Sequence, residues 1–134
     1  MNLPITALTA AICAIMLLIT AMDTVRHRMR GGHSFGDGGD AKLVSAARSH
    51  GNLAEHAPLV IIMIGVLEAS RAHHWALTGL AVVFLGARAA HIVGLYAPVS
   101  TKPPMGRQIG VMGTWAVMLA LIVWILWRVV ALNG

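Results

Sequence analysis

The chain has 134 residues, of which 57% are hydrophobic and 11% charged, with a formal net charge of +5. Such a composition is typical of membrane proteins, and the length limits the chain to one domain, residues 1–134. The basic residues lie in short loops beside apolar runs, without a basic helix or an aromatic platform, so we expect no nucleic acid partner. The single cysteine, Cys13, excludes an intramolecular disulfide.

Four apolar segments follow one another, and each is predicted to form a membrane-spanning helix. The first run, Leu3–Met22, is long enough to cross a hydrocarbon core of about 30 Å. No Lys or Arg precedes it and it is longer than the apolar part of a usual signal peptide, so a retained helix is favoured over a cleaved one. The fold class is therefore all-α, an integral membrane four-helix bundle with helices over about residues 3–24, 41–69, 74–96 and 106–131.

A polar segment, Asp23–Asp40, is predicted to be the first loop. It contains Gly36-Asp-Gly-Gly39, which lacks the Lys and Ser/Thr of a phosphate-binding loop and is interpreted as a turn. Asp40 is predicted to cap the second helix, and Pro58 to kink it. Several glycines of the last two apolar segments are predicted to allow close helix contact: Gly79, Gly86, Gly110 and Gly113.

The distribution of Lys and Arg predicts the orientation of the chain in the membrane. The first and third loops carry most of these residues, whereas the opposite side has Arg71 and Arg128. Because positively charged loops stay in the cytoplasm, both termini are expected outside it.

Polar side chains of the second and third predicted helices interrupt the apolar surface. Arg48, Asn52 and Glu55 are spaced at i, i+4 and i+7, so they share one helical face. Arg88 and His91 share a face of the third helix in the same way. An ionisable side chain at membrane depth costs at least ~2.5–3.5 kcal/mol unless it is paired or faces a wet cavity, which indicates a site inside the bundle.

Two interpretations of these residues stay open at this point. Arginines gathered around one carboxylate, with Arg26 and Arg107 in the same half of the membrane, favour a pocket for a small anionic ligand. Alternatively, Arg48 and Glu55 pair as structural glue while Asn52 bonds a neighbouring backbone and the other arginines only set topology, as in a non-catalytic membrane protein.

Two further functions also have some support. Glu55 is the kind of membrane carboxylate that a small proton-coupled multidrug transporter uses, although the surrounding arginines argue against a cation site. Haem or metal ligation through His50, His56 and His91 is the weaker hypothesis, because their spacing is not that of a ligand set, and we expect no metal.

Residues 48–58, Arg-Ser-His-Gly-Asn-Leu-Ala-Glu-His-Ala-Pro, resemble the motif of the MAPEG family, the membrane-associated proteins in eicosanoid and glutathione metabolism. The loop at residues 36–39 resembles that of the bacterial inner-membrane branch. The resemblance implies a homotrimer in the inner membrane that acts as a glutathione transferase or peroxidase. Glutathione, the cosubstrate, would lie between adjacent subunits near the cytoplasmic surface, and a hydrophobic second substrate would arrive from the lipid.

The resemblance also assigns residues. Arg48, Asn52 and Glu55 match the positions that hold glutathione in the family, and Arg107 resembles the arginine that stabilises the glutathione thiolate. The other positions similar to glutathione contacts or site-lining residues of family members are Arg26, Arg88 and His91. His56, the remaining predicted glutathione-binding residue, stands where many members have Tyr. This departure from the motif bears on catalysis by Arg107 and leaves the expectation of glutathione binding in place.

Overall fold

The computed structural model describes residues 2–98 and 102–133, and within these residues it contains four α-helices and no strand. They are α1 (Pro4–Gly31), α2 (Ala41–Ala69), α3 (His74–Leu95) and α4 (Met105–Asn133). Each is long and apolar enough to cross a membrane. The prediction of an all-α chain with four helices able to span a membrane is therefore confirmed within the described residues.

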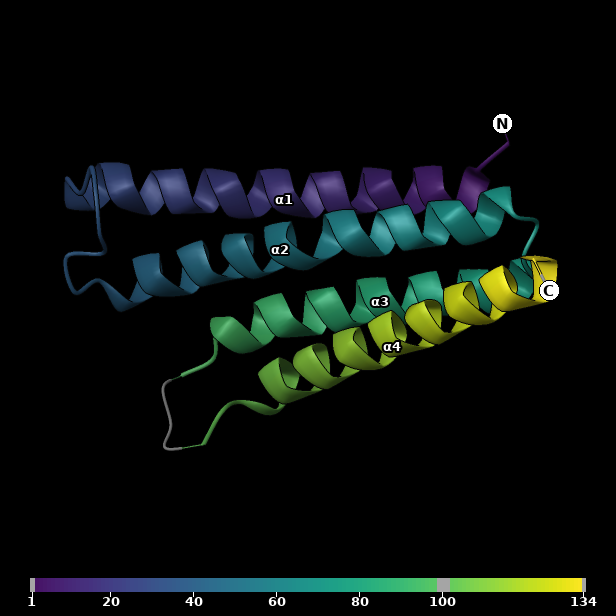
Figure 1. The fold of residues 1–134 in the computed structure, drawn as a ribbon. Coiled ribbons are helices and arrows are strands. Elements are labelled where there is room, and N and C mark those ends of the chain that lie inside the picture. The colour runs from purple at the N-terminus through teal and green to yellow at the C-terminus, as the bar shows by residue number, and fades with distance from the viewer. Residues whose placement is uncertain (1, 99–101, 134) are drawn as a thin grey trace.

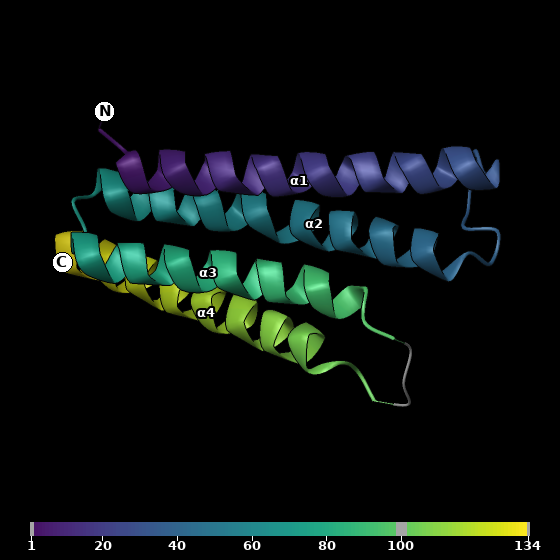
Figure 2. The same cartoon turned by 180° about the vertical axis from the view of Figure 1, so that it is seen from behind.

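The helices form two hairpins that lie side by side, α1 with α2 and α3 with α4 (Figure 1). Both termini and the α2–α3 connection lie at one end, here called the terminal end. The α1–α2 and α3–α4 connections lie at the other, here called the loop end. In both views the α1–α2 hairpin extends further at the loop end than the α3–α4 hairpin (Figure 2). The first turns of α2 therefore stand beside the α3–α4 connection.

Helix α1 continues about two turns beyond the predicted boundary, because Asp23–Gly31 is helical rather than a loop. Polarity alone does not end a helix, and this segment is free of glycine and proline until Gly31. His27 lies 3.7 Å from Asp23, an i, i+4 pair that supports the added turns. The helix ends where Gly32 adopts a left-handed φ of 67° and its N–H donates to the carbonyl of Arg28.

Asp40 caps α2 as predicted. Its carboxylate accepts hydrogen bonds from the N–H of Lys42 at 2.8 Å and of Leu43 at 3.3 Å. The bond from Lys42 is the main reason why the pKa of Asp40 lies below its usual value. The helix then runs through Pro58 as one element.

At the terminal end, Glu68 of α2 holds the start of α1. Its carboxylate accepts hydrogen bonds from the backbone N–H groups of Ile5 and Thr6, both at 2.8 Å, and from the Thr6 hydroxyl at 2.6 Å. The first N–H groups of a helix lack partners within the helix and form the positive end of its dipole. A carboxylate there accepts their hydrogen bonds and is attracted by the positive charge. This contact fastens α1 to α2.

Apolar side chains from all four helices form the core, including Leu53, Val60, Ile64, Leu67, Phe84, Val117 and Leu121. Helices α3 and α4 approach most closely near the loop end. A Cβ built on Gly94 would lie 2.2 Å from the backbone nitrogen of Arg107, and one on Gly110 would lie 2.4 Å from the Cβ of His91. The predicted close contacts are thus confirmed at Gly110, and at Gly113, where a Cβ would meet Ala87 at 3.0 Å.

The same prediction was wrong for Gly79 and Gly86. A Cβ at either position would meet nothing within 4 Å. Both glycines are exposed on the surface of α3, away from α4.

Candidate functional site

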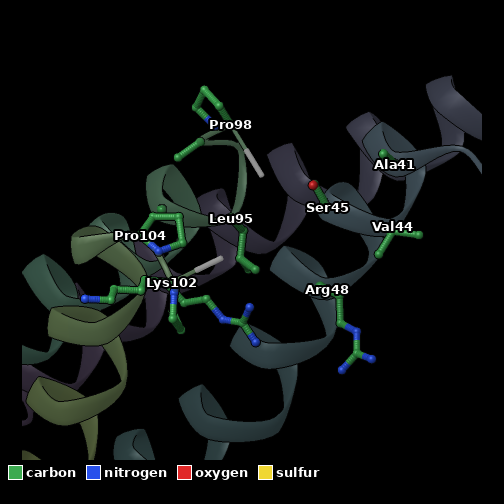
Figure 3. A pocket seen from close by; sticks show the side chains of 12 residues that line it. Ala41, Val44, Ser45, Arg48, Leu95, Pro98, Lys102 and Pro104 are labelled. Carbon is green, nitrogen blue, oxygen red and sulfur yellow. The ribbon is translucent and has the colours of Figure 1, made fainter. Parts of the chain in front are cut away.

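A pocket of about 560 Å³ opens at the loop end of the bundle, between the first turns of α2 and the α3–α4 connection (Figure 3). Among its described lining residues three are cationic, and none is acidic. It is called the basic pocket below. Its lining consists of Ala41, Val44, Ser45, Arg48, Gly94, Leu95, Ala97, Pro98, Lys102, Pro103, Pro104 and Arg107.

One wall of the basic pocket is a single face of α2. Its four residues, Ala41, Val44, Ser45 and Arg48, are spaced at i, i+3, i+4 and i+7, so the first two turns of the helix present them together. The Asp40 cap fixes where those turns begin. The position of Arg48 in the pocket therefore follows from the start of the helix.

The opposite wall combines the end of α3, the α3–α4 connection and the start of α4; Leu95, Pro98, Lys102 and Pro104 stand across from α2 (Figure 3). Hydrogen bonds from α4 hold this wall. The Gln108 side chain donates to the carbonyl of Pro103 at 2.7 Å, and the N–H of Arg107 donates to that of Pro104 at 3.0 Å. Gly94 also packs closely against the backbone of Arg107. These contacts fix the position of Arg107, the third cationic residue of the pocket.

Next to the pocket, Arg88 forms a buried polar contact between three helices. Its side chain is 1% exposed, and it donates from Nη1 to Oδ1 of Asn52 at 3.2 Å and from Nη2 to the carbonyl of Gly110 at 2.7 Å. Its Nε has no hydrogen-bond partner among the residues that the structure describes. The predicted polar face of α2 thus meets that of α3 through Asn52 and Arg88.

His91 is also buried, one turn from Arg88 on α3. Its Nδ1 lies 3.3 Å from the carbonyl oxygen of Arg107, so it contacts the start of α4. His56 is partly exposed, and its Nδ1 lies 2.7 Å from the carbonyl oxygen of Asn52. Each imidazole therefore contacts a backbone carbonyl instead of the other histidine.

Two of the predicted site residues lie apart from the basic pocket. Glu55 is exposed on α2 and Arg26 is exposed on α1, and neither lines the pocket. Among the described residues the structure records one ion pair, between His27 and Asp23, so Arg48 and Glu55 are not paired within this chain. The structure brings Arg48 and Arg107 together in the pocket and Asn52, Arg88 and His91 beside it.

The histidines of the metal hypothesis are separated in the same way. His50 contacts the hydroxyl of Thr20 at 3.2 Å, whereas His56 and His91 contact the carbonyls described above. Within residues 2–98 and 102–133 there is no group of three His, Cys, Asp or Glu side chains that could hold a metal ion.

One lining residue of the basic pocket and one hydrogen bond near it were not predicted. Lys102 is one of the basic loop residues that were used only to predict the orientation. Its place beside Pro103 and Pro104 in a short connection was a signal that it is held near the next helix. Tyr96, the residue after α3, donates a hydrogen bond from its hydroxyl to the carboxylate of Asp23 on α1. Burial, together with this bond and the charge of Asp23, raises the pKa of Tyr96 to about 12.

These features define a class of protein: a four-helix bundle with the dimensions of a membrane protein and a basic pocket at its loop end. The model of the MAPEG family matches residues 6–127, and the chain belongs to that family. It is 32% identical over 123 residues to the "Inner membrane protein YecN" of Escherichia coli strain K12, covering 92% of this chain and 91% of that protein. The protein of the same name from E. coli O6:H1 matches equally, and no solved structure matches.

Proposed function

We propose that this protein binds glutathione at the loop end and transfers it to, or uses it to reduce, lipophilic electrophiles. The observation that carries the proposal is the convergence of Arg48, Lys102 and Arg107 on one pocket without an acidic lining residue. Family membership is consistent with it.

The chemistry of the basic pocket fits this ligand. Glutathione has two carboxylates and one ammonium group, so it is a net anion near neutral pH. Guanidinium groups bind carboxylates through two parallel hydrogen bonds and keep their charge on burial. The pocket volume of about 560 Å³ is within the range of small-molecule sites. Glu55, one turn beyond Asn52 on α2, offers a carboxylate for the ligand's ammonium group.

We further propose a homotrimer in which a neighbouring subunit covers the exposed face of α2. Arg48 and Glu55 are both exposed on the single chain, although they lie on a helix that is apolar enough to span a membrane. Contact with lipid would be unfavourable for both charges, whereas a seam between subunits can hold water and ligand. Light scattering of the detergent-purified protein gives the number of subunits; a monomer or a dimer contradicts this part of the proposal.

Arg107 is the proposed catalytic residue. A cation held against the glutathione sulfur lowers the pKa of the thiol, and the thiolate is the nucleophile. In conjugation the sulfur forms a bond to an electrophilic carbon, which releases its leaving group. The test is the ultraviolet thiolate absorbance of bound glutathione, which should fall in Arg107→Ala; unchanged spectra remove this role.

The proposed location is the bacterial inner membrane, with the loop end in the cytoplasm and both termini outside. The names of the relatives support the membrane, and the distribution of Lys and Arg supports the orientation. Reporter fusions to each terminus test this orientation: activity of a cytoplasm-specific reporter at either end contradicts it.

Calorimetric titration of glutathione into the detergent-purified protein tests binding. Arg48→Ala and Glu55→Gln should weaken binding, whereas Arg30→Ala, which removes an exposed loop-end charge outside the pocket, should leave it unchanged. Absence of binding to the wild type refutes the proposal. Vesicle transport that depends on Glu55, without glutathione binding, would instead support the exporter.

A further inference from the structure

We infer that Arg88 is a positioning residue that turns the Asn52 amide so that its two N–H groups face the ligand. This inference rests on the proposed function and adds to it the atom that Asn52 presents. Arg88 itself is only 1% exposed, so it acts through Asn52 rather than by touching the ligand.

The orientation of the amide follows from hydrogen-bond chemistry. A guanidinium group has donors and no acceptor, so only the amide oxygen of Asn52 can face Arg88. The observed contact is of this kind, from Nη1 to Oδ1 at 3.2 Å. The Nδ2 group lies on the other branch of the amide and must therefore point away from Arg88. Asn52 is partly exposed and shares a face of α2 with Arg48, so its N–H groups remain available to a ligand on that face.

Arg88 is held firmly enough to impose this orientation. Its Nη2 donates to the carbonyl of Gly110 at 2.7 Å, and that carbonyl also accepts from the hydroxyl of Thr114 at 2.8 Å. The lack of a Cβ at Gly110 lets α3 and α4 come close enough for this bond. The planar guanidinium group of an arginine presents its donors in a rigid fork, whereas the donors of a lysine ammonium rotate on a flexible stem.

The inference defines what Asn52 recognises. An amide that presents only N–H groups selects an acceptor, which in glutathione means a carboxylate or peptide carbonyl oxygen. The Asn52 amide and the Glu55 carboxylate thus give this face of α2 a hydrogen-bond donor next to an acceptor. This arrangement would determine the orientation in which glutathione binds.

The test compares Asn52→Asp with Asn52→Ala in glutathione titrations, with thermal unfolding measured for each. Aspartate has the shape of asparagine and can still accept from Arg88, but it has no N–H to offer and adds a negative charge next to an anion. We expect Asn52→Ala to weaken binding about tenfold or more and Asn52→Asp to weaken it further, with a melting temperature no lower than that of Asn52→Ala. Asn2→Asp, the same change at the terminal end, should bind like the wild type.

If Asn52 only joins α2 to α3, Asn52→Asp restores the joint and binds like the wild type, or more tightly than Asn52→Ala; either result overturns the inference. Should Asn52→Asp fail to fold, the wild type decides. With isotopically labelled asparagine, the side-chain amide signal of Asn52 must shift on addition of glutathione, and an unshifted signal refutes the inference. A wild type that binds no glutathione refutes the proposed function together with this inference. A wild type that binds glutathione while the Asn52 variants or the Asn52 signal contradict the expectation refutes only the inference.

Discussion

Replacing Glu68 by Ala removes the contact that fastens the start of α1 to the end of α2. The carboxylate accepts three hydrogen bonds, of 2.8, 2.8 and 2.6 Å, two of them from backbone N–H groups that have no partner within the helix. Hydrogen bonds to charged groups contribute about 1.5–3 kcal/mol each when buried. Glu68 is only partly buried and the freed N–H groups can bind water, so we expect a total loss of about 1–3 kcal/mol.

This loss corresponds to a melting temperature lower by on the order of 5–10 °C, measured by thermal unfolding in detergent. Glu68→Gln, which keeps one acceptor oxygen and loses the charge, should lie between Glu68→Ala and the wild type. An unchanged melting temperature for Glu68→Ala would show that the contact contributes nothing to stability.

Two further predictions concern the loop end. Tyr96 is the only tyrosine of the chain, so a phenolate absorbance titration reports on it alone, and its midpoint should lie near pH 12. Stability should fall between about pH 10 and 12, because the tyrosine ionises at a lower pH in the unfolded chain than in the folded protein. Asp23→Asn should lower the midpoint of the titration. A wild-type midpoint near pH 10 would contradict the hydrogen bond from Tyr96 to Asp23. Gly94→Ala should lower stability by about 1–3 kcal/mol in chemical unfolding, because the new Cβ would lie 2.2 Å from the backbone of Arg107, whereas Gly86→Ala on the same helix should not destabilise; equal effects of the two changes would refute this account of the α3–α4 contact.

Features encoded within a single element could be predicted from the sequence. The four apolar segments became helices, and Asp40 caps α2, because hydrophobic length and the local cap need no knowledge of neighbouring elements. The end of α1 was predicted too early because a polar segment was interpreted as a loop, whereas only Gly32 provides a terminator.

Features that depend on packing between helices were predicted poorly. Glycine spacing does not say which face of α3 meets α4, so Gly86 could not be told from Gly110. The contacts of Glu68 with α1, of Tyr96 with Asp23 and of Lys102 with the pocket join distant parts of the sequence. The polar spacing of α2 predicted that Asn52 shares a helical face with Arg48, but only the structure identified Arg88 as its hydrogen-bond partner.

The most direct measurement of the central claim is a double-mutant cycle of glutathione affinity with Arg48→Ala, Arg107→Ala and the double variant. If both cations of the basic pocket hold one ligand, each single change should weaken binding about tenfold or more, and the double variant should lose less than the product of the two effects. A wild type without affinity for glutathione, or single variants that bind as the wild type does, would contradict the account.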